Sequence, residues 1–364
     1  MLILGIDTSC DDTSASVMED GSKILSNIVS SQTEIHARYN GIVPELASRR
    51  HIEMILPVVE ESLKKADVSL SEISAIAVCH GPGLIGSLLV GCSFAKAVCY
   101  SKGIPLIAVN HLEGHLLSAF LESPSPEFPF LSLVVSGGHT SLYIAEDFGK
   151  YTEIGRTRDD AAGEAFDKVS KLLGLGYPGG PVIDRLAAEG NPHAIEFPRA
   201  YLPETFDFSF SGLKTAVLNY LRVQEQKIGS AEAQMSAPPQ PPLGKGGIEG
   251  GVSSELQNFR TSALVSDIAA SFQAAVIDVL ARKVEWAVKK ERINRVTLSG
   301  GVSANSSLRK RINEIGKGKG WEVFMPSTAL CTDNAAMIAC AGYHRFLNKD
   351  FAGLDLNPKA YLPL

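Results

Sequence analysis

The sequence predicts an α/β protein built from two duplicated α/β lobes around a cleft. Three segments support this fold class, because each places a glycine-rich or polar turn directly after a buried strand: residues 4–17 (LGIDTSCDDTSASV), 130–146 (FLSLVVSGGHTSLYIAE) and 295–312 (RVTLSGGVSANSSLRKRI). The first two turns connect the strands of hairpins, and the third leads into a helix. Repetition of this unit indicates an internal duplication with two sheets facing the cleft.

Size and composition limit the function classes. The chain has 364 residues, 45% of them hydrophobic, which favours two or more domains. The formal net charge of -6 does not predict attraction of the whole molecule to nucleic acid. We expect a soluble cytoplasmic protein that does not bind a membrane, because we find neither a leader segment nor a run approaching about 18 apolar residues. The six cysteines are scattered without a C-x-x-C pair, so neither disulfides nor cysteine-ligated zinc is expected.

Short basic runs are the local exceptions to the acidic balance. They are Arg49–Arg50, the group Lys289, Lys290 and Arg292, and Arg309–Arg311. Any of them could contribute to an RNA-binding patch. Short runs of this kind more often form a solvated helix face, and that is the interpretation we prefer here.

The N-terminal part of the sequence predicts strands and helices in the following chain order. Strands are predicted at 2–7, 15–18 and 23–32, which gives a three-stranded meander. A helix follows from Pro44 to about Ala66, in which Pro57 predicts a kink or break. The segment 73–83 (ISAIAVCHGPG) then reads as a buried strand with a glycine turn, and 84–103 as a helix that stops at Gly103.

The C-terminal half contains further helices and one segment of different composition. Residues 159–187 predict a helix with Glu164, Asp167 and Lys168, followed by Gly179-Gly180-Pro181 and Asp184. Solvated helix carboxylates are the default; alternatively, Asp167 and Asp184 hold hydroxyls of a polar ligand. Ser303 or Asn305 is expected to cap the helix after strand 295–299. Residues 226–258 are rich in Gly, Pro, Ser and Ala and predict a flexible surface insertion, and Gly244-Lys245 within it lacks the context of a P-loop.

Paired histidines form a second constellation in the segment 110–122, NHLEGHLLSAFLE. Asn110 can cap a helix, with Glu113 at capping-box spacing, so His111 and His115 lie one turn apart on the same face. Two such imidazoles can share a metal if a third ligand is supplied, or they can be one solvated and one hydrogen-bonded core histidine. Zinc peptidase chemistry is excluded because Leu112, not Glu, follows the first histidine.

A third constellation lies at residues 330–346, LCTDNAAMIACAGYHRF. Thr332 or Asp333 could simply cap a helix of small residues. A carboxylate at that helix start would also complete a His, His, Asp metal site.

Glycine turns such as Ser136–Thr140 and Ser299–Ser303 present clustered backbone N–H groups, which favour an anion. Each turn alone is most simply an ordinary tight turn. Together with the opening turn they resemble the two phosphate loops and the adenosine loop of the superfamily that contains actin, the large heat-shock chaperones and sugar kinases. This resemblance implies an actin-like ATPase fold with a nucleotide between the lobes.

The ordered set of motifs resembles one family, the tRNA N6-adenosine threonylcarbamoyltransferases. The motifs span nearly the whole chain: GIDTSCDDTS, GIVPELASRRH, GPGLIGSLLVG, NHLEGH, LVVSGGHT, GEAFDKVSKLLGLGYPGGP, FSFSGLKTA, SGGVSANSSLR and CTDNAAM. The resemblance implies transfer of threonylcarbamoyl from threonylcarbamoyl-adenylate to N6 of the adenosine 3′ of the anticodon, with release of AMP. The tRNAs concerned read codons that begin with A.

The resemblance also assigns site residues. The metal ligands are His111, His115 and Asp333, for Fe2+ or alternatively Zn2+, and Asp11 is an acidic catalytic residue. The positions that contact ATP or the adenylate are Val134, Val135, Ser136, Gly137, Gly138, Asp167, Gly180, Asp184 and Asn305. Implied partners are the anticodon stem-loop of tRNA, an inactive paralogue in a heterodimer, and a small P-loop ATPase.

Two further interpretations of the sequence stay open, a small-molecule kinase of the same superfamily and a non-enzymatic interaction protein of the inactive-paralogue type. The kinase would need no His, His, Asp site, and the inactive paralogue would lack the paired histidines. The sequence departs from the family pattern at Asn40-Gly41, where Gly-Gly is usual, and at the insertion. The predicted lobes are 1–125 plus 327–364, and 126–326.

Overall fold

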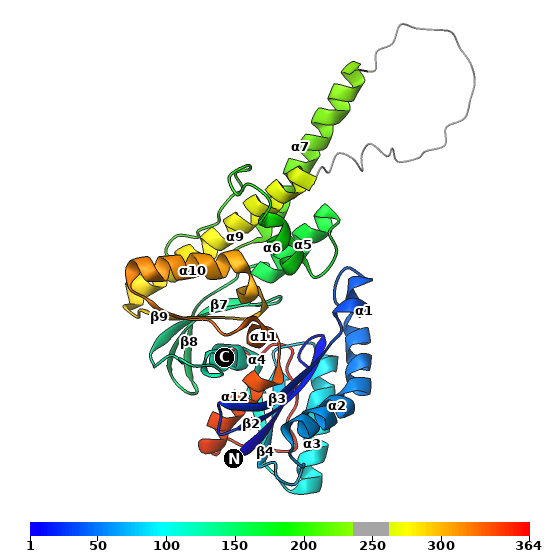
Figure 1. The fold of residues 1–364 in the computed structure, drawn as a ribbon, viewed down its shortest axis with the longest axis vertical. Coiled ribbons are helices and arrows are strands. Elements are labelled where there is room, and N and C mark those ends of the chain that lie inside the picture. Colours follow the sequence, from blue (N-terminus) through cyan, green and yellow to red (C-terminus); the bar gives the residue numbers. More distant parts are fainter. Residues whose placement is uncertain (236–261) are drawn as a thin grey trace, which may run out of the picture.

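The computed structural model describes residues 1–235 and 262–364. Its strands form two five-stranded sheets, which lie in two lobes (Figure 1). In the first sheet the strand order is β3-β2-β1-β4-β5, and in the second it is β10-β9-β6-β7-β8. Each sheet joins an antiparallel meander of three strands to two parallel strands, so the topologies are the same. The predicted duplication and α/β class are confirmed.

The first sheet carries helices on both faces. Its strands are β1 (Leu2–Asp7), β2 (Asp12–Glu19), β3 (Lys23–Ser31), β4 (Ala75–Gly81) and β5 (Leu106–Asn110). Side chains alternate along β1, so Leu4 and Ile6 pack under α2 (Pro44–Ala66) and α3 (Ile85–Lys102). Ile3 faces α12 (Ala335–Leu347) on the other side. Gly5 allows this contact, because an added Cβ would collide with the Ala335 carbonyl oxygen.

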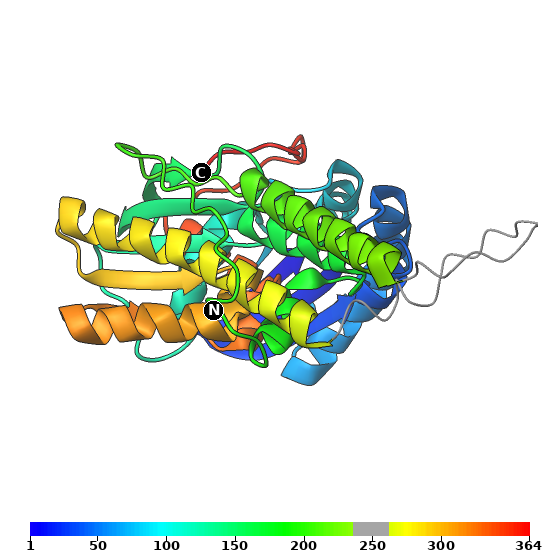
Figure 2. The ribbon, with the colours of Figure 1, turned by 90° about the horizontal axis from the view of Figure 1, so that it is seen from above.

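The second sheet forms the other lobe. Its strands are β6 (Phe130–Val135), β7 (Thr140–Asp147), β8 (Lys150–Arg156), β9 (Arg295–Ser299) and β10 (Glu322–Phe324). The helices α9 (Ser262–Glu291) and α10 (Ser306–Lys319) lie side by side across its outer face (Figure 2). The remaining helices of this lobe are α5 (Ala162–Leu173), α6 (Gly179–Ala187), α7 (Ser211–Met235) and the short η2 (Gly301–Ala304).

Four short helices complete the described fold. They are α1 (Thr33–Ala37), α4 (His111–Leu117), η1 (Ser118–Phe120) and α11 (Thr328–Cys331). Every residue of α4 is buried, and α4 packs against α12 and β6. Strands from residues 2–110 build the first sheet and strands from 130–324 the second, and the lobe boundaries stay a prediction.

Several local predictions are confirmed. The second helix spans Pro44–Ala66 as expected, and Gly103 ends α3 with a left-handed φ of 64°. Asn305 caps α10 by accepting a hydrogen bond from the Leu308 backbone N–H at 2.9 Å. Asn40 takes a positive φ of 52°, as a residue replacing glycine in this turn must. All six cysteines are free thiols, as predicted.

Other predictions need correction. Of the predicted kink or break at Pro57 the break is wrong, because α2 is continuous through this residue, and the kink stays a prediction. The cap of α12 is Asn334, which accepts from the Ala336 and Met337 backbone N–H groups, and not Thr332 or Asp333. Arg309 is not part of a solvated face, because its guanidinium donates to the backbone carbonyls of Ser303, Met325 and Pro326.

Two long helices also differ from the expectations. Residues 226–235 of the predicted insertion belong to α7, and the rest of the insertion up to residue 258 lies outside the described residues. Contrary to the sequence prediction, the segment Ala263–Glu291 is long and apolar enough to span a membrane. However, 72% of its most apolar window is buried against the second sheet and its helices, as expected for a core helix.

Candidate functional site

The paired histidines and Asp333 meet in the structure. The backbone enters α4 directly from β5, and the Asn110 side chain caps the helix by accepting from the Leu112 N–H at 2.8 Å. Asp333 Oδ1 lies 3.2 Å from His115 Nε2 and 3.6 Å from His111 Nε2. The two imidazole centroids are 4.6 Å apart and nearly perpendicular. Asp333, which lies just before α12, thus completes a three-residue cluster with His111 and His115 of α4.

A second carboxylate lies behind the cluster. Asp7 Oδ2, at the end of β1, is 3.3 Å from His111 Nδ1, and Asp7 is 1% exposed. The ligand-type atoms of Asp7, Cys79 and His111 also lie within 4.8 Å of one another. A carboxylate on the far nitrogen of an imidazole fixes its tautomer and orientation when the near nitrogen binds a metal. The sequence reasoning did not find Asp7 in this role.

A buried nitrogen that faces Asp333 shows that the cluster suits a cation. His115 Nε2 is buried and makes no hydrogen bond in the described part of the chain, although it lies 3.2 Å from Asp333 Oδ1. Leaving such groups unsatisfied is costly in a folded protein. Two imidazole nitrogens and a carboxylate oxygen within 4.8 Å form a donor set suited to iron or zinc, and the set leaves room for a further ligand. The residues therefore fit a bound divalent metal.

The carboxylates also control the charge of the imidazoles. Burial disfavours protonated His111, yet Asp333 and Asp7 outweigh this and raise its pKa well above the usual value. His115 has the opposite balance, because burial lowers its pKa. Burial also acts against the ionised Asp333, but the neighbouring His111 and His115 hold its pKa well below the usual range. A cation is thus favoured at this position by an ionised carboxylate.

An ion pair fixes the two helices that carry the cluster. Glu113, on α4 between the histidines, is 2% exposed and accepts from Arg345 of α12 at Nε (2.9 Å) and Nη2 (2.8 Å). The hydroxyl of Tyr151 donates to the same carboxylate at 3.3 Å. Glu113 therefore does not form the predicted capping box. It ties α4 to α12 instead.

A cavity of about 710 Å³ opens beside the cluster, between the lobes. Its volume is in the range of small-molecule sites. Ten of the predicted site residues line it: Asp11, His111, Ser136, Gly137, Gly138, Asp167, Gly180, Asp184, Asn305 and Asp333. The remaining three do not. His115 is fully buried behind the wall, and the side chains of Val134 and Val135 point into the two hydrophobic cores, so these two could reach a ligand only through backbone atoms.

The crowded turn between β1 and β2 is held rigidly at the cavity. Thr8 Oγ1 donates to the Ser87 carbonyl of α3 at 2.8 Å, and His51 of α2 bonds to Thr13 and to the Cys10 carbonyl. Asp11 is exposed to the cavity but is substantially buried, and burial together with the charge of Asp333 raises its pKa. Its carboxylate is therefore a stronger base than an ordinary aspartate.

On the opposite wall, carboxylates position the glycine turns and helix ends. Asp167 accepts from the Gly179 N–H at 2.7 Å, and burial raises its pKa to about 6. Asp184 accepts from Ser306 N and Oγ at 2.9 Å, at the first turn of α10. The default prediction for these carboxylates was a solvated helix face. Asp167 and Asp184 instead accept hydrogen bonds from other groups of the protein.

Sequence reasoning missed several cavity residues. Tyr177, Arg185, Gly163 and Thr33 line the cavity, as does His139, whose pKa is lowered to about 4 chiefly by burial. His139 lies within the predicted glycine turn Ser136–Thr140, and this position was the available signal. Gly163 and Tyr177 lie within the motif GEAFDKVSKLLGLGYPGGP, which was the available signal for them, whereas Arg185 and Thr33 carry none.

The duplicated sheets and the cavity between them define a two-lobed protein of the actin-like ATPase fold, with the His, His, Asp cluster beside the cavity. Two solved structures support the fold. HypF in its phosphate- and nucleotide-bound form has a TM-score of 0.55 at 16% identity, covering 95% of this chain and 46% of that chain. Component A of the Acidaminococcus fermentans (R)-2-hydroxyglutaryl-CoA dehydratase has a TM-score of 0.50 at 14% identity, covering 95% and 98%.

Sequence comparison identifies the family. Residues 23–340 match the family model of tRNA N6-adenosine threonylcarbamoyltransferase. The enzyme of that name from Thermodesulfovibrio yellowstonii is 56% identical over 364 residues, covering all of both chains. That of Clostridioides difficile is 49% identical over 358 residues, covering 98% of this chain and 96% of the relative. The chain belongs to the tRNA N6-adenosine threonylcarbamoyltransferase family, a family of transferases, and the kinase reading is not favoured.

Proposed function

We propose that this chain transfers the threonylcarbamoyl group of threonylcarbamoyl-adenylate to N6 of the adenosine 3′ of the anticodon in tRNA. The observation that carries the proposal is a His, His, Asp cluster at the edge of a cavity of about 710 Å³ in a member of this transferase family that aligns with its Thermodesulfovibrio relative over all of both chains. In the reaction an N–C bond forms at N6, the C–O bond to the adenylate phosphate breaks, and a proton leaves the amine. AMP is the leaving group.

His111, His115 and Asp333 are the residues that would hold a divalent metal, Fe2+ or alternatively Zn2+. When bound, the metal supplies Lewis-acid polarisation of the threonylcarbamoyl carbonyl. Asp7 orients the His111 ring through Nδ1, and the Glu113–Arg345 pair keeps α4 and α12 in register. These contacts preorganise the ligand atoms.

The adenylate is proposed to lie in the cavity against the glycine turns. The glycine turn at Gly137–Gly138 would favour its phosphate, whereas the Ser136 N–H already donates to the His139 carbonyl and the Ser306 and Leu308 N–H groups of α10 already donate to Asp184 and Asn305. Asn305 and Asp184 are already fixed there, because Gln273 of α9 bonds to both side chains, at 2.7 and 3.1 Å. Asp167 and Gly180 line the same wall and would contact the nucleoside.

Asp11 is the proposed proton acceptor. It faces the cavity, and its raised pKa brings its basicity closer to working pH than that of an ordinary aspartate. The amine of adenine must lose its proton as the new bond forms. The acceptor base itself must leave the stack of the anticodon loop to reach the cleft.

Nucleoside mass spectrometry tests the proposal. The wild-type chain, with its partners, is expected to form threonylcarbamoyladenosine in tRNA and to contain one metal per chain. His111→Ala should lose both metal and product, whereas the exposed His193→Ala is a matched control that should keep both. Retention of metal and full modification by His111→Ala, or phosphorylation of a metabolite by the wild type, would exclude this function.

The heterodimer partner is proposed to dock on α2 and α3. Four large apolar side chains are exposed there at helical spacing: Ile52 and Leu56 on α2, and Ile85 and Leu89 on α3, each at least 52% exposed. Adjacent helices with exposed apolar residues are typical of a protein interface. Leu56→Asp should abolish co-purification with the inactive paralogue, and unchanged co-purification would exclude this surface. The small P-loop ATPase remains a proposal from the family resemblance.

A further inference from the structure

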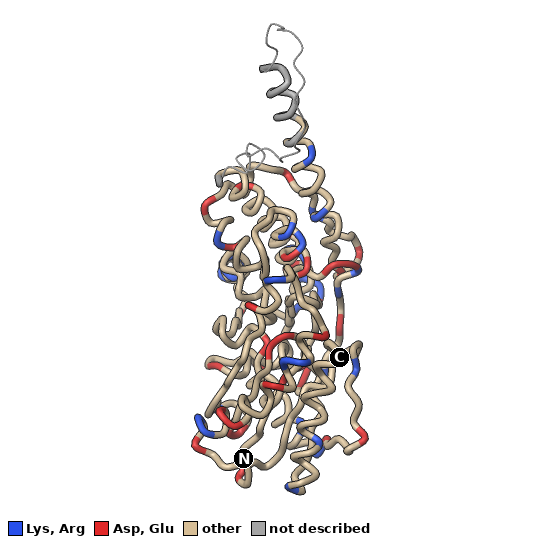
Figure 3. Tube along the Cα trace, turned by 90° about the vertical axis from the view of Figure 1, so that its right-hand side faces the viewer, with Lys and Arg blue, Asp and Glu red and all other residues tan. Residues whose placement is uncertain are grey.

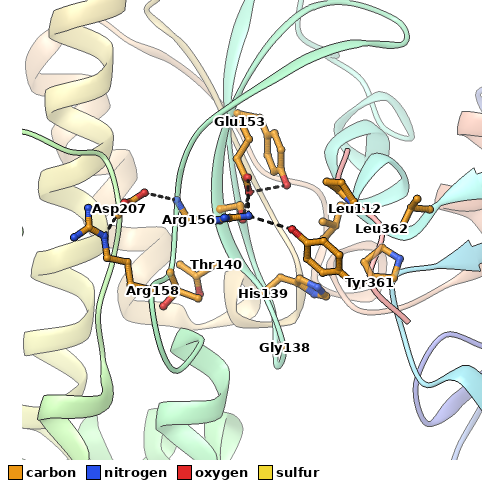
Figure 4. A pocket seen from close by; sticks show the side chains of 15 residues that line it. Leu112, Gly138, His139, Thr140, Glu153, Arg156, Arg158, Asp207, Tyr361 and Leu362 are labelled. Carbon is orange, nitrogen blue, oxygen red and sulfur yellow. Dashed lines mark hydrogen bonds and ion pairs between the residues drawn. The ribbon is translucent and has the colours of Figure 1, made fainter. Parts of the chain in front are cut away.

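A second cavity, of about 590 Å³, adjoins the cleft (Figure 4). The two cavities share three lining residues, Pro82, Gly138 and His139. Leu112, which follows the candidate ligand His111, also lines the second cavity. A wall only a few residues thick therefore separates the second cavity from the candidate metal cluster.

The C-terminal segment forms part of this wall. Ala360 lines the first cavity, whereas Tyr361 and Leu362 line the second. The Gly83 N–H donates to the Ala360 carbonyl, and Asn110 Nδ2 donates to the Leu362 carbonyl at 3.2 Å. Because Asn110 also caps α4, the wall and the histidine helix are held by the same side chain.

The side chains of the second cavity match the chemistry of a nucleotide. Tyr361 is 71% exposed, and its hydroxyl accepts from Arg156 Nη1 at 3.3 Å (Figure 4). Arg156 and Arg158 are both more than half exposed, and their acidic neighbours are Glu153 at 3.8 Å and Asp207 at 2.8 Å. A planar aromatic side chain suits base stacking, and exposed guanidinium groups suit phosphates.

The negative net charge of the molecule makes local basic groups important for binding RNA. Basic and acidic residues are interspersed along the trace (Figure 3), and the net charge is -6. RNA contact by this chain therefore depends on local groups more than on a general positive field.

We propose that the second cavity receives the acceptor adenosine of the RNA, with its base against Tyr361 and its flanking phosphates at Arg156 and Arg158. This inference rests on the proposed function and names the acceptor side of the same site. The amine of the adenosine must approach the threonylcarbamoyl carbonyl from a side that the rest of the adenylate does not occupy. The first cavity takes the donor, and N6 of the adenine reaches it beside Gly138 and His139, which line both cavities.

The test uses the full chain assembled with its partners. Steady-state rates are measured with either tRNA or threonylcarbamoyl-adenylate varied, and binding of an anticodon stem-loop is measured separately by fluorescence anisotropy. Tyr361→Ala should raise the KM for tRNA and the stem-loop Kd about 5- to 100-fold, because a stacked base is lost. Tyr361→Phe should stay near wild type. The KM for the adenylate should not change in either variant.

Two further variants sharpen the result. Arg156→Ala should weaken stem-loop binding and reduce the slope of log K against log salt by about 0.7 to 0.9, as removal of one phosphate contact does. Tyr201→Ala is the matched control, since Tyr201 is also exposed and lies beside an arginine, Arg282. It should bind as wild type.

The outcomes separate the inference from the proposed function. Unchanged stem-loop binding by Tyr361→Ala, or an equal rise in the KM for the adenylate, would overturn the acceptor cavity while wild-type turnover still supports the transferase. Absence of product from the wild type would instead count against the proposed function. In that case, stem-loop binding that is lost in Tyr361→Ala and kept in Tyr361→Phe would still support an RNA-binding cavity.

Discussion

The ion pair between Glu113 and Arg345 gives the sharpest prediction about what holds the histidine helix. Arg345→Met keeps most of the side-chain volume and removes the charge. Glu113 is 2% exposed and would then lie buried without its cation, although Tyr151 still donates to it. Removing one partner of a buried pair typically costs 3–5 kcal/mol. Because Arg345 itself is 29% exposed, we expect a value at the lower end, about 3 kcal/mol.

A double-mutant cycle separates the pair from general packing. Glu113→Gln alone should lose about 1–2 kcal/mol, since Arg345 keeps its contact with Asp350. The double variant should recover stability relative to Arg345→Met, with a coupling energy of about 2 kcal/mol. Urea unfolding gives these free energies, and metal content per chain reports whether the histidines stay aligned. A loss below about 1 kcal/mol for Arg345→Met, with no coupling, would refute the reasoning.

Three further predictions concern residues outside this pair. Asp167 has a folded pKa of about 6, above its unfolded value, so its ionisation opposes folding. Between about pH 4 and 6 the wild type should therefore lose about 2 kcal/mol relative to Asp167→Asn, and denaturation at both pH values checks this. Gly5→Ala should destabilise strongly, by about 3 kcal/mol, through collision with Ala335, whereas Gly318→Ala, in open space on α10, should stabilise slightly in the same unfolding assay. Asn334→Ala should cost about 1–2 kcal/mol of capping energy and weaken metal binding, measured by chelator competition, because Asp333 precedes this cap; an unchanged metal affinity would show that the cap does not position Asp333.

Local patterns explain why much of the fold was predictable. The i, i+4 spacing of His111 and His115 after a capping Asn110 fixes their shared face, whatever the rest of the chain does. The same holds for the helix ending at Gly103, where a left-handed residue is required. Such features depend on a few neighbouring residues, so the sequence contains all the information needed.

Long-range partners were not predictable in this way. Asp7 lies 104 residues before His111, and Arg345 lies 232 residues after Glu113. Only the sheet topology brings them to α4. The predicted kink or break at Pro57 is not a break, and the reason is tertiary, because α2 packs Ile55, Val58 and Val59 on either side of it against the sheet.

The residues of the candidate site were predictable from the sequence only in part. The turn at Ser136–Gly138 was found from its glycine pattern and Asn305 as a helix cap, and both line the cavity. The assignment of Val134 and Val135 came from the family resemblance, yet alternation along β6 turns both side chains into the cores. The helix-start pattern at 332–334 did not tell a cap from a ligand, since Asp333 and Asn334 are both good capping residues.

Anomalous diffraction from crystals of the metal-loaded chain tests the central claim most directly. The account predicts a single peak about 2.0–2.2 Å from His111 Nε2, His115 Nε2 and an Asp333 carboxylate oxygen, facing the nucleotide cavity. A peak among Asp7, Cys79 and His111 instead, or ordered side chains with no peak at saturating metal, would contradict it.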